Sequence, residues 1–223
     1  MSPSFNLNLS RLLWVLWGVA VGLVAIHVIL NLVHYLYTDL PWLARQIFDV
    51  DEEDSFPTWF SAMLLLLTSV SLWVNARTLQ SSDSSLVERW YLLSVGFLLL
   101  SIDEIAGMHE TLNSIDMMGD MSWTIPGAIV AGLAGLYFVP FLLKLPRPLA
   151  IRFVLAGAVY LGGALGVEVL TDPYLENDEL NTLAYNLWTA LEESMEIAGV
   201  LIFLGGLFPL LRTGTPRLQV QLD

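Results

Sequence analysis

The chain has 223 residues, of which 56% are hydrophobic and 14% charged, and its mean hydropathy is +0.66. This is more apolar surface than one soluble core can bury, so the composition predicts an integral membrane protein. The formal net charge of −13, with no basic patch, excludes nucleic-acid binding, and the absence of cysteine excludes disulfides, thiolate ligands and a catalytic thiol.

Six apolar runs are each long enough to cross a hydrocarbon layer of about 30 Å, which takes about 20 helical residues. They are residues 12–37, 57–79, 90–108, 123–143, 149–170 and 183–211. The first run is as long as a full span, so we expect it to stay as a helix and not to be cleaved as a signal peptide. The runs lack the alternation of a barrel strand, and helices satisfy their own backbone in lipid.

The predicted fold class is therefore all-α, a polytopic membrane protein with six transmembrane helices in one bundle. A single domain covers residues 1–223, with an acidic outer loop at 38–56 and a short cytoplasmic tail at 212–223. The basic residues fall at the N-terminus, in the second and fourth loops and at the C-terminus, with Arg45 as the exception. The positive-inside rule then places both termini in the cytoplasm. The expected location is the bacterial inner membrane.

One stretch departs sharply from this apolar background. SIDEIAGMHE, residues 101–110, carries Asp103, Glu104, His109 and Glu110 at the end of the third apolar run. Ionisable side chains at membrane depth are costly, and they usually face the interior of a bundle and mark a functional site. The small residues between Asp103 and Glu110 would let a neighbouring helix come close.

Two other helices carry polar groups at helical spacing. His27, Asn31 and His34 fall on one stripe of the first helix. Three acids of the sixth helix lie within an arc of about 100°: Glu192, Glu193 and Glu196. Acids placed so closely repel one another unless something positive joins them. The tetrapeptide Glu-Ile-Ala-Gly occurs both here, at 196–199, and in the third helix, at 104–107.

These groups are also expected to share one depth in the membrane. A helix rises about 1.5 Å per residue, and counting from the basic inner end of each helix puts His27, Asp103, Glu168 and Glu196 at ~21–24 Å. That layer is the outer half of the bilayer. No arginine or lysine in any helix falls at this depth by the same count, so protons or bound cations are expected to neutralise the acids.

The two acidic motifs, SIDEIAGMHE and the later EESMEIAGVLIF, resemble motifs of a group of bacterial multi-pass membrane proteins without an assigned activity. The matching positions are Asp103, Glu104, His109, Glu110, Glu193 and Glu196. The resemblance covers mainly the third and sixth helices. It implies a shared site and no particular reaction.

Three functions follow from this pattern. The leading one is a metalloenzyme that acts on a lipophilic substrate from the bilayer, by hydrolysis or by oxygen activation, with iron, zinc or manganese held by His and carboxylate donors. The predicted ligands are His34, His109, Glu110, Glu193 and Glu196. The predicted acid–base or ligand-supporting residues are His27, Asp103, Glu104 and Glu192.

The alternatives are a proton or cation transporter or channel, and a non-catalytic accessory subunit of a membrane complex. A transport pathway needs polar groups in the inner half of the bilayer. The inner halves of the third and sixth helices, LLSVGFLLL and VLIFLGGLF, are almost entirely apolar. This favours a closed site that opens to one side. The expected partners are membrane lipids and a lipophilic substrate, and the sequence names no partner subunit.

Overall fold

The computed structural model describes residues 8–79, 84–108, 123–177 and 179–214. Within these ranges the chain forms helices and no strand, so the prediction of an all-α protein is confirmed. The elements are α1 (Leu9–Leu36), α2 (Trp42–Gln46), α3 (Phe56–Thr78), α4 (Ser84–Ala106), α6 (Thr124–Lys144), α7 (Arg147–Leu161), the π-helix η2 (Gly162–Val167), α8 (Glu168–Glu176) and α9 (Leu183–Gly214).

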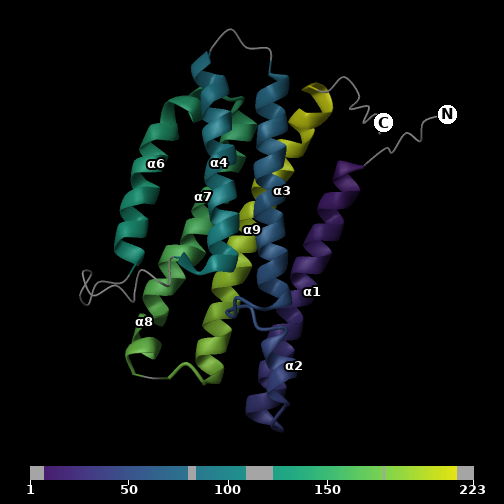
Figure 1. Ribbon diagram of the computed structural model, residues 1–223, viewed down its shortest axis with the longest axis vertical. Coiled ribbons are helices and arrows are strands. Elements are labelled where there is room, and N and C mark those ends of the chain that lie inside the picture. Colours follow the sequence, from purple (N-terminus) through teal and green to yellow (C-terminus); the bar gives the residue numbers. More distant parts are fainter. Residues whose placement is uncertain (1–7, 80–83, 109–122, 178, 215–223) are drawn as a thin grey trace, which may run out of the picture.

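Six of these helical stretches are long and apolar enough to cross a membrane, and they form one bundle (Figure 1). Five spans are single helices, and the remaining one runs through α7, η2 and most of α8. The prediction of six spans in one bundle is therefore confirmed.

The two ends of the bundle differ in charge. α1 begins and α9 ends at the same end at which α3 ends, α4 begins and α6 connects to α7, whereas α2 and α8 lie at the opposite end (Figure 1). The basic end carries Arg77 at the close of α3, Lys144 at the close of α6 and Arg147 at the start of α7. The other end, which we call the acidic end, carries the segment 49–54 with five Asp and Glu residues.

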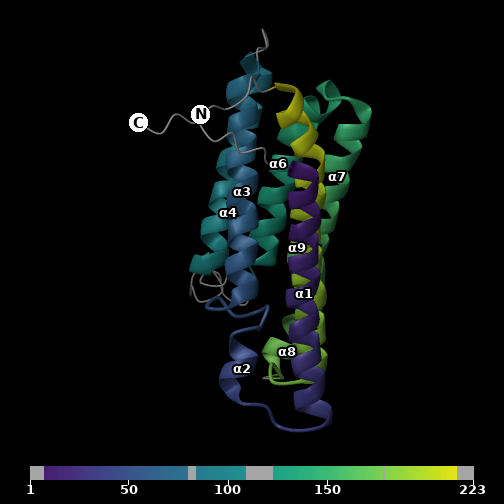
Figure 2. The same cartoon turned by 90° about the vertical axis from the view of Figure 1, so that its right-hand side faces the viewer.

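α9 is the central helix of the bundle. It packs against α1, α3, α7, η2 and α8 (Figure 2). Toward the basic end its Leu201, Leu204 and Leu207 are fully buried. Phe153 of α7 stacks on Phe203 of α9 with ring centroids 4.0 Å apart. Apolar packing thus fills this half of the bundle around α9.

α3 and α4 are joined by hydrogen bonds between small polar residues. The Ser69 hydroxyl donates to the Ser94 carbonyl at 2.7 Å, and the Ser94 hydroxyl donates to the Ser69 carbonyl at 2.8 Å. One level further toward the acidic end, the Ser101 hydroxyl donates to the Ala62 carbonyl at 2.8 Å. Small side chains that bond across a helix pair are typical of membrane bundles, because they allow close backbone approach.

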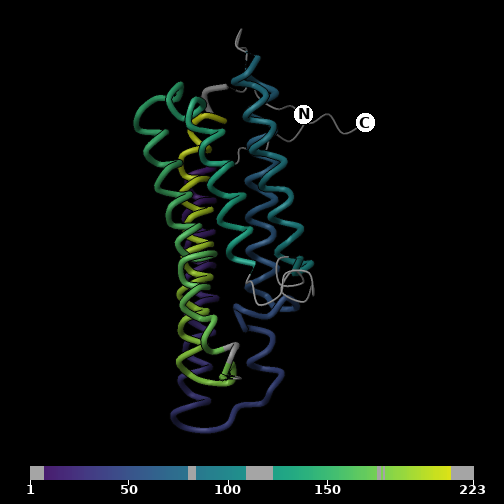
Figure 3. Tube along the Cα trace, turned by 90° about the vertical axis from the view of Figure 1, so that its left-hand side faces the viewer, coloured from purple at the N-terminus to yellow at the C-terminus, as the bar shows by residue number. Residues whose placement is uncertain are grey.

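α6 lies at the edge of the bundle, between α4 and the α7–η2–α8 span (Figure 3). Most of its apolar side chains are exposed, for example Leu136 at 72% and Leu143 at 81%. In a protein that spans a bilayer these side chains meet lipid, which is as apolar as they are. α6 therefore covers one side of the bundle and is not part of its central core.

A candidate acid–base site around helix α9

Glycines bring the π-helix η2 directly against the acidic face of α9. A Cβ atom on Gly163 would lie 2.7 Å from the Glu192 carbonyl oxygen and 3.2 Å from Cγ of Glu196. A Cβ on Gly162 would lie 2.8 Å from the end of the Met195 side chain. At Gly163 only a residue without a side chain fits, because the contact is to backbone, and π-turns within helices are frequent at functional sites.

One turn further along α9, Gly199 allows a similarly close approach of α7. A Cβ there would lie 2.8 Å from both the backbone nitrogen and Cβ of Tyr160, and 2.9 Å from the Ala156 carbonyl oxygen. This close approach places Tyr160 beside the preceding turn of α9. Its hydroxyl forms a hydrogen bond with the Glu196 side chain, and the carboxylates of Glu193 and Glu104 lie within electrostatic range.

Three acidic side chains and one phenol from three helices thus lie within electrostatic range at this place. We call Glu104 of α4, Glu193 and Glu196 of α9, and Tyr160 of α7 the carboxylate cluster. Glu193 interacts electrostatically with both Glu196 and Glu104. All four residues are partly buried. Carboxylates gathered in this way favour binding of protons or other cations.

A second pair of carboxyl groups extends the cluster toward the acidic end. The buried Glu192 forms a side-chain hydrogen bond with Glu168, the first residue of α8. A hydrogen bond between two carboxyl groups requires a proton on one of them. The indole N–H of Trp123 donates to Oε1 of Glu168 at 3.1 Å. Glu168 is thereby fixed between α6 and α9.

The end of α4 is closed by the outer segment. Gly107 has φ +51°, the left-handed conformation that commonly ends a helix, and its N–H donates to the Asp103 carbonyl at 2.8 Å. A Cβ on Gly107 would clash with Oε1 of Glu53. Glu53 therefore fills the space that a side chain at Gly107 would need. Gly107 is three residues after Glu104 of the cluster. In both Glu-Ile-Ala-Gly repeats, the glutamate belongs to the carboxylate cluster and the glycine lies in close contact with another segment of the chain.

His27 holds the outer segment onto the bundle. The side chain is buried, its Nε2–H donates to the Asn186 carbonyl of α9 at 3.1 Å, and its Nδ1 accepts from the Val50 N–H at 3.3 Å. Because a carbonyl can only accept, the contact with Asn186 places a proton on Nε2. Nδ1 is also 3.4 Å from Asp49. His27 is thus a structural attachment of the 49–50 segment in this arrangement.

The rest of the α1 stripe continues this attachment. Asn31 is buried, and its Oδ1 accepts a hydrogen bond from Nη2 of Arg45 at 3.2 Å. The Arg45 guanidinium also lies over the Tyr35 ring, 5.2 Å from its centroid. His34 accepts the Leu40 N–H at 3.1 Å through Nδ1. The stripe predicted from the sequence therefore faces the outer segment.

A polar pocket of about 290 Å³ lies between this segment and the start of α9. Asp49, Asp51, Arg45, Asn181 and Tyr185 are among its lining residues. The Tyr185 hydroxyl donates to Oδ2 of Asp51 at 2.9 Å. Asp51 is also within electrostatic range of the Glu192 and Glu193 side chains. The carboxyl groups thus continue from the cluster to a pocket at the acidic end.

A family model matches residues 9–210, which is most of the chain. The chain belongs to DUF8692, a family described as a domain of unknown function. The matched range of this DUF8692 chain includes the whole carboxylate cluster. Neither the curated proteins nor the solved structures compared with the chain gave a match.

The structure brings some of the predicted site residues together and separates others. Glu104, Glu193 and Glu196 meet in the cluster, and Glu192 adjoins it. Asp103 is one turn from the end of α4, where its carbonyl caps the helix. His27 and His34 are held by the outer segment instead. The predicted residues His109 and Glu110 lie outside the described residues.

The predicted metal site is not supported by the described part of the chain. Among those residues, no group of three or more His, Cys, Asp or Glu side chains is arranged to hold a metal ion. Of the predicted ligands His34, His109, Glu110, Glu193 and Glu196, the second and third lie outside the described residues, and His34 accepts the Leu40 N–H.

The prediction that all the acids and histidines share one layer needs correction for α1. The depth count put His27 level with Glu196, but the structure places it at Asn186, ten residues earlier in α9 and nearer the acidic end. Sequence reasoning also missed Tyr160, Trp123 and Glu53. The available signal for Tyr160 was its phenol within an apolar run, and no local signal pointed to Glu53.

Proposed function

We propose that this protein is a membrane enzyme that acts on a lipophilic substrate, with the carboxylate cluster as its acid–base centre. The observation that carries the proposal is that Tyr160 of α7 and Glu193 of α9 each interact electrostatically with both Glu196 and Glu104 of α4. Close glycine contacts at Gly163 and Gly199 hold them in place. Carboxyl groups that are positioned by packing and by a phenol suit proton transfer to and from a reacting group.

The neighbouring residues suggest separate roles within the centre. The Tyr160 hydroxyl orients Glu196, so we assign Glu196 as the proton-accepting group. Glu193 and Glu104 provide the negative environment that would favour a cationic or proton-donating group at this position. The Glu192–Glu168 pair holds a proton between two carboxyl groups and leads toward the pocket at the acidic end. We assign this pair to proton exchange with the aqueous side.

The apolar packing toward the basic end supports a site that is open to one side only. Leu201, Leu204 and Leu207 are fully buried there, and Phe153 stacks on Phe203. A pathway for protons or cations would need polar groups in this half as well. Transport is therefore the second proposal. It predicts proton flux in proteoliposomes that Glu196→Gln abolishes, whereas the enzyme predicts no flux.

A divalent metal, iron, zinc or manganese, stays a separate proposal. The cluster offers carboxylate oxygens, which suit such ions, and a histidine ligand would have to come from His109. We also propose that the protein lies in a bacterial inner membrane with both termini in the cytoplasm. The support for this orientation is the gathering of basic residues at the end where α1 begins and α9 ends.

The test is a comparison of membrane lipids from cells that produce the wild type, Glu193→Gln or Glu88→Gln. Glu88 is an exposed acid near the start of α4, so Glu88→Gln is the matched control. We expect one lipid class to change in cells with the wild type and with Glu88→Gln, and not with Glu193→Gln. Identical lipid profiles in all of these cells and in cells without the protein would refute the enzyme and favour an accessory subunit.

Metal content, measured by plasma mass spectrometry on protein purified without chelators, decides the cofactor separately. An equivalent of iron, zinc or manganese that is present in the wild type and lost in both His109→Ala and Glu193→Gln would assign a metal to the cluster. A metal-free wild type that retains activity would remove the cofactor from the proposal.

A further inference from the structure

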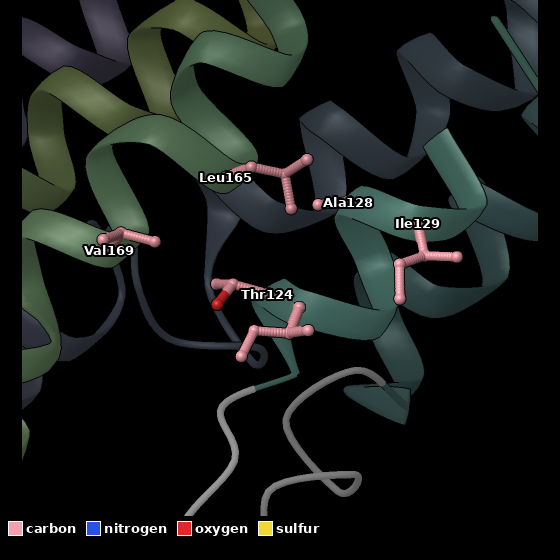
Figure 4. A pocket seen from close by; sticks show the side chains of 6 residues that line it. Thr124, Ala128, Ile129, Leu165 and Val169 are labelled. Carbon is pink, nitrogen blue, oxygen red and sulfur yellow. The ribbon is translucent and has the colours of Figure 1, made fainter. Parts of the chain in front are cut away.

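An apolar groove runs along the side of the bundle next to the carboxylate cluster. It has a volume of about 420 Å³ and is lined by Thr124, Ile125, Ala128, Ile129, Leu165 and Val169. The side chains come from the first turns of α6 on one wall and from η2 and α8 on the other (Figure 4). The volume is within the range of about 300–1,000 Å³ that is usual for small-molecule sites.

The groove faces the surroundings of the protein and not its core. Ile125, Ile129 and Val169 are about half exposed, and all belong to candidate membrane spans. Their positions, at the start of α6 and the close of the α7–η2–α8 span, place the groove in the half of the bundle near the acidic end. At this depth the surrounding medium is hydrocarbon, so the occupant that fits the lining is an acyl chain.

One end of the groove carries polar groups that connect to the cluster. Thr124 is buried and lines the groove, and the preceding residue, Trp123, donates its indole N–H to Glu168. Glu168 is in turn hydrogen-bonded to Glu192 of α9. Two hydrogen bonds, Trp123 to Glu168 and Glu168 to Glu192, therefore connect the residue next to Thr124 with α9, and η2 has Leu165 in the groove and Gly163 against Glu196.

The charge at this end restricts the head group. The Glu168–Glu192 pair shares one proton and so keeps one negative charge, which repels a phosphate or a fatty-acid carboxylate, since like charges placed side by side cost several kcal/mol. Hydroxyl and amine groups can instead donate hydrogen bonds to carboxylate oxygens. The complementary ligand has an apolar chain and a head group with hydroxyl or amine donors and no net negative charge.

We propose that the groove binds the acyl chain of such an outer-leaflet lipid and presents its head group to the carboxylate cluster. The binding part of this inference stands on the groove, and only the conversion of the lipid rests on the proposed function. The substrate class is then a neutral or cationic single-chain lipid, for which a monoacylglycerol is a suitable probe.

The test is photolabelling of the purified full-length protein in lipid nanodiscs with a diazirine-bearing monoacylglycerol. Ala128→Trp fills the groove, and Ala134→Trp makes the same change on the exposed face of α6 outside it. A displaced chain stays in the hydrocarbon of the bilayer, so the loss of labelling reports the space that the tryptophan fills and not hydrophobic transfer from water. We expect this loss in Ala128→Trp only, with the label in the wild type mapping to residues 124–129 or 165–169.

Two further arms separate the proposals. Glu193→Gln should keep its labelling while losing any effect on membrane lipids, because the groove is outside the cluster. A fatty acid of the same chain length should label the wild type less than the monoacylglycerol does. Equal labelling of the wild type, Ala128→Trp and Ala134→Trp, or stronger labelling by the fatty acid, would overturn the inference and leave the acid–base proposal to its own test.

Discussion

Replacing Gly199 by alanine tests the packing that builds the carboxylate cluster. The new Cβ would lie 2.8 Å from the Tyr160 backbone nitrogen and 2.9 Å from the Ala156 carbonyl oxygen. Both contacts are to backbone, so no side-chain rotation relieves them and α7 has to move away from α9. Overpacking of this kind costs about 1–3 kcal/mol. For a chain of this size that corresponds to a fall in Tm of about 2–12 °C.

Gly132→Ala is the matched control for this substitution. Gly132 lies within α6 and has nothing within 4 Å of its added Cβ, so alanine there should be neutral or stabilising by up to about 1 kcal/mol. Thermal unfolding in detergent, followed by size-exclusion chromatography of the heated samples, measures both variants. A Gly199→Ala protein as stable as Gly132→Ala would refute the close α7–α9 contact and with it the placement of Tyr160 at Glu196.

Three further predictions address the outer segment and the orientation of the chain. Gly107→Ala should destabilise the protein through both its positive φ and its clash with Glu53, and adding Glu53→Ala should restore only part of the loss, since the backbone strain of about 1–2 kcal/mol remains. His27→Ala leaves the Val50 N–H without this acceptor, so hydrogen–deuterium exchange should accelerate over residues 47–52, and unchanged exchange there would contradict the attachment. Because the chain has no cysteine, Ser85→Cys and Asn181→Cys each carry a single thiol, and a membrane-impermeant maleimide applied to intact spheroplasts should label Asn181→Cys only. The reverse labelling would invert the proposed orientation.

The sequence predicted the spans and the gathering of acids on α9 because both depend on local patterns. Apolar length defines a span, and the spacing of Glu192, Glu193 and Glu196 defines a helix face. Glu104 could be added from the depth count, since α4 begins near the basic end. These inferences need no knowledge of how the helices are shifted along one another.

The depth count assumed that the basic residue of each helix marks the same level. It failed where that residue is not at the end of the bundle. Nη1 of Arg152 donates to the Gly205 carbonyl, seven residues before Arg212 on α9. Arg152 and Arg212, from which depth was counted on the fifth and sixth spans, therefore lie at levels that differ by about 10 Å. Glu168 is accordingly paired with Glu192 and not with Glu196. The long arginine side chain can reach along a helix, and its position therefore marks a level only loosely.

The same shift affects α1 and explains why the histidines were misplaced. Leu13, two residues after Arg11, lies against Gly205, which is seven residues before Arg212. α1 is thus displaced toward the acidic end, and His27 meets Asn186. Tyr160 and Glu53 were missed for a related reason, because their positions depend on Gly199 and Gly107 contacting residues distant in sequence.

Lipid turnover by the purified protein is the most direct test of the central claim that the carboxylate cluster is an acid–base centre. The wild type, Glu193→Gln and Glu88→Gln would be reconstituted in nanodiscs that contain the monoacylglycerol and total membrane lipids, and the lipids followed over time by mass spectrometry. The account predicts that one lipid is consumed by the wild type and by Glu88→Gln, and that Glu193→Gln is inactive while still folded and photolabelled. Turnover by Glu193→Gln at the wild-type rate would contradict the account.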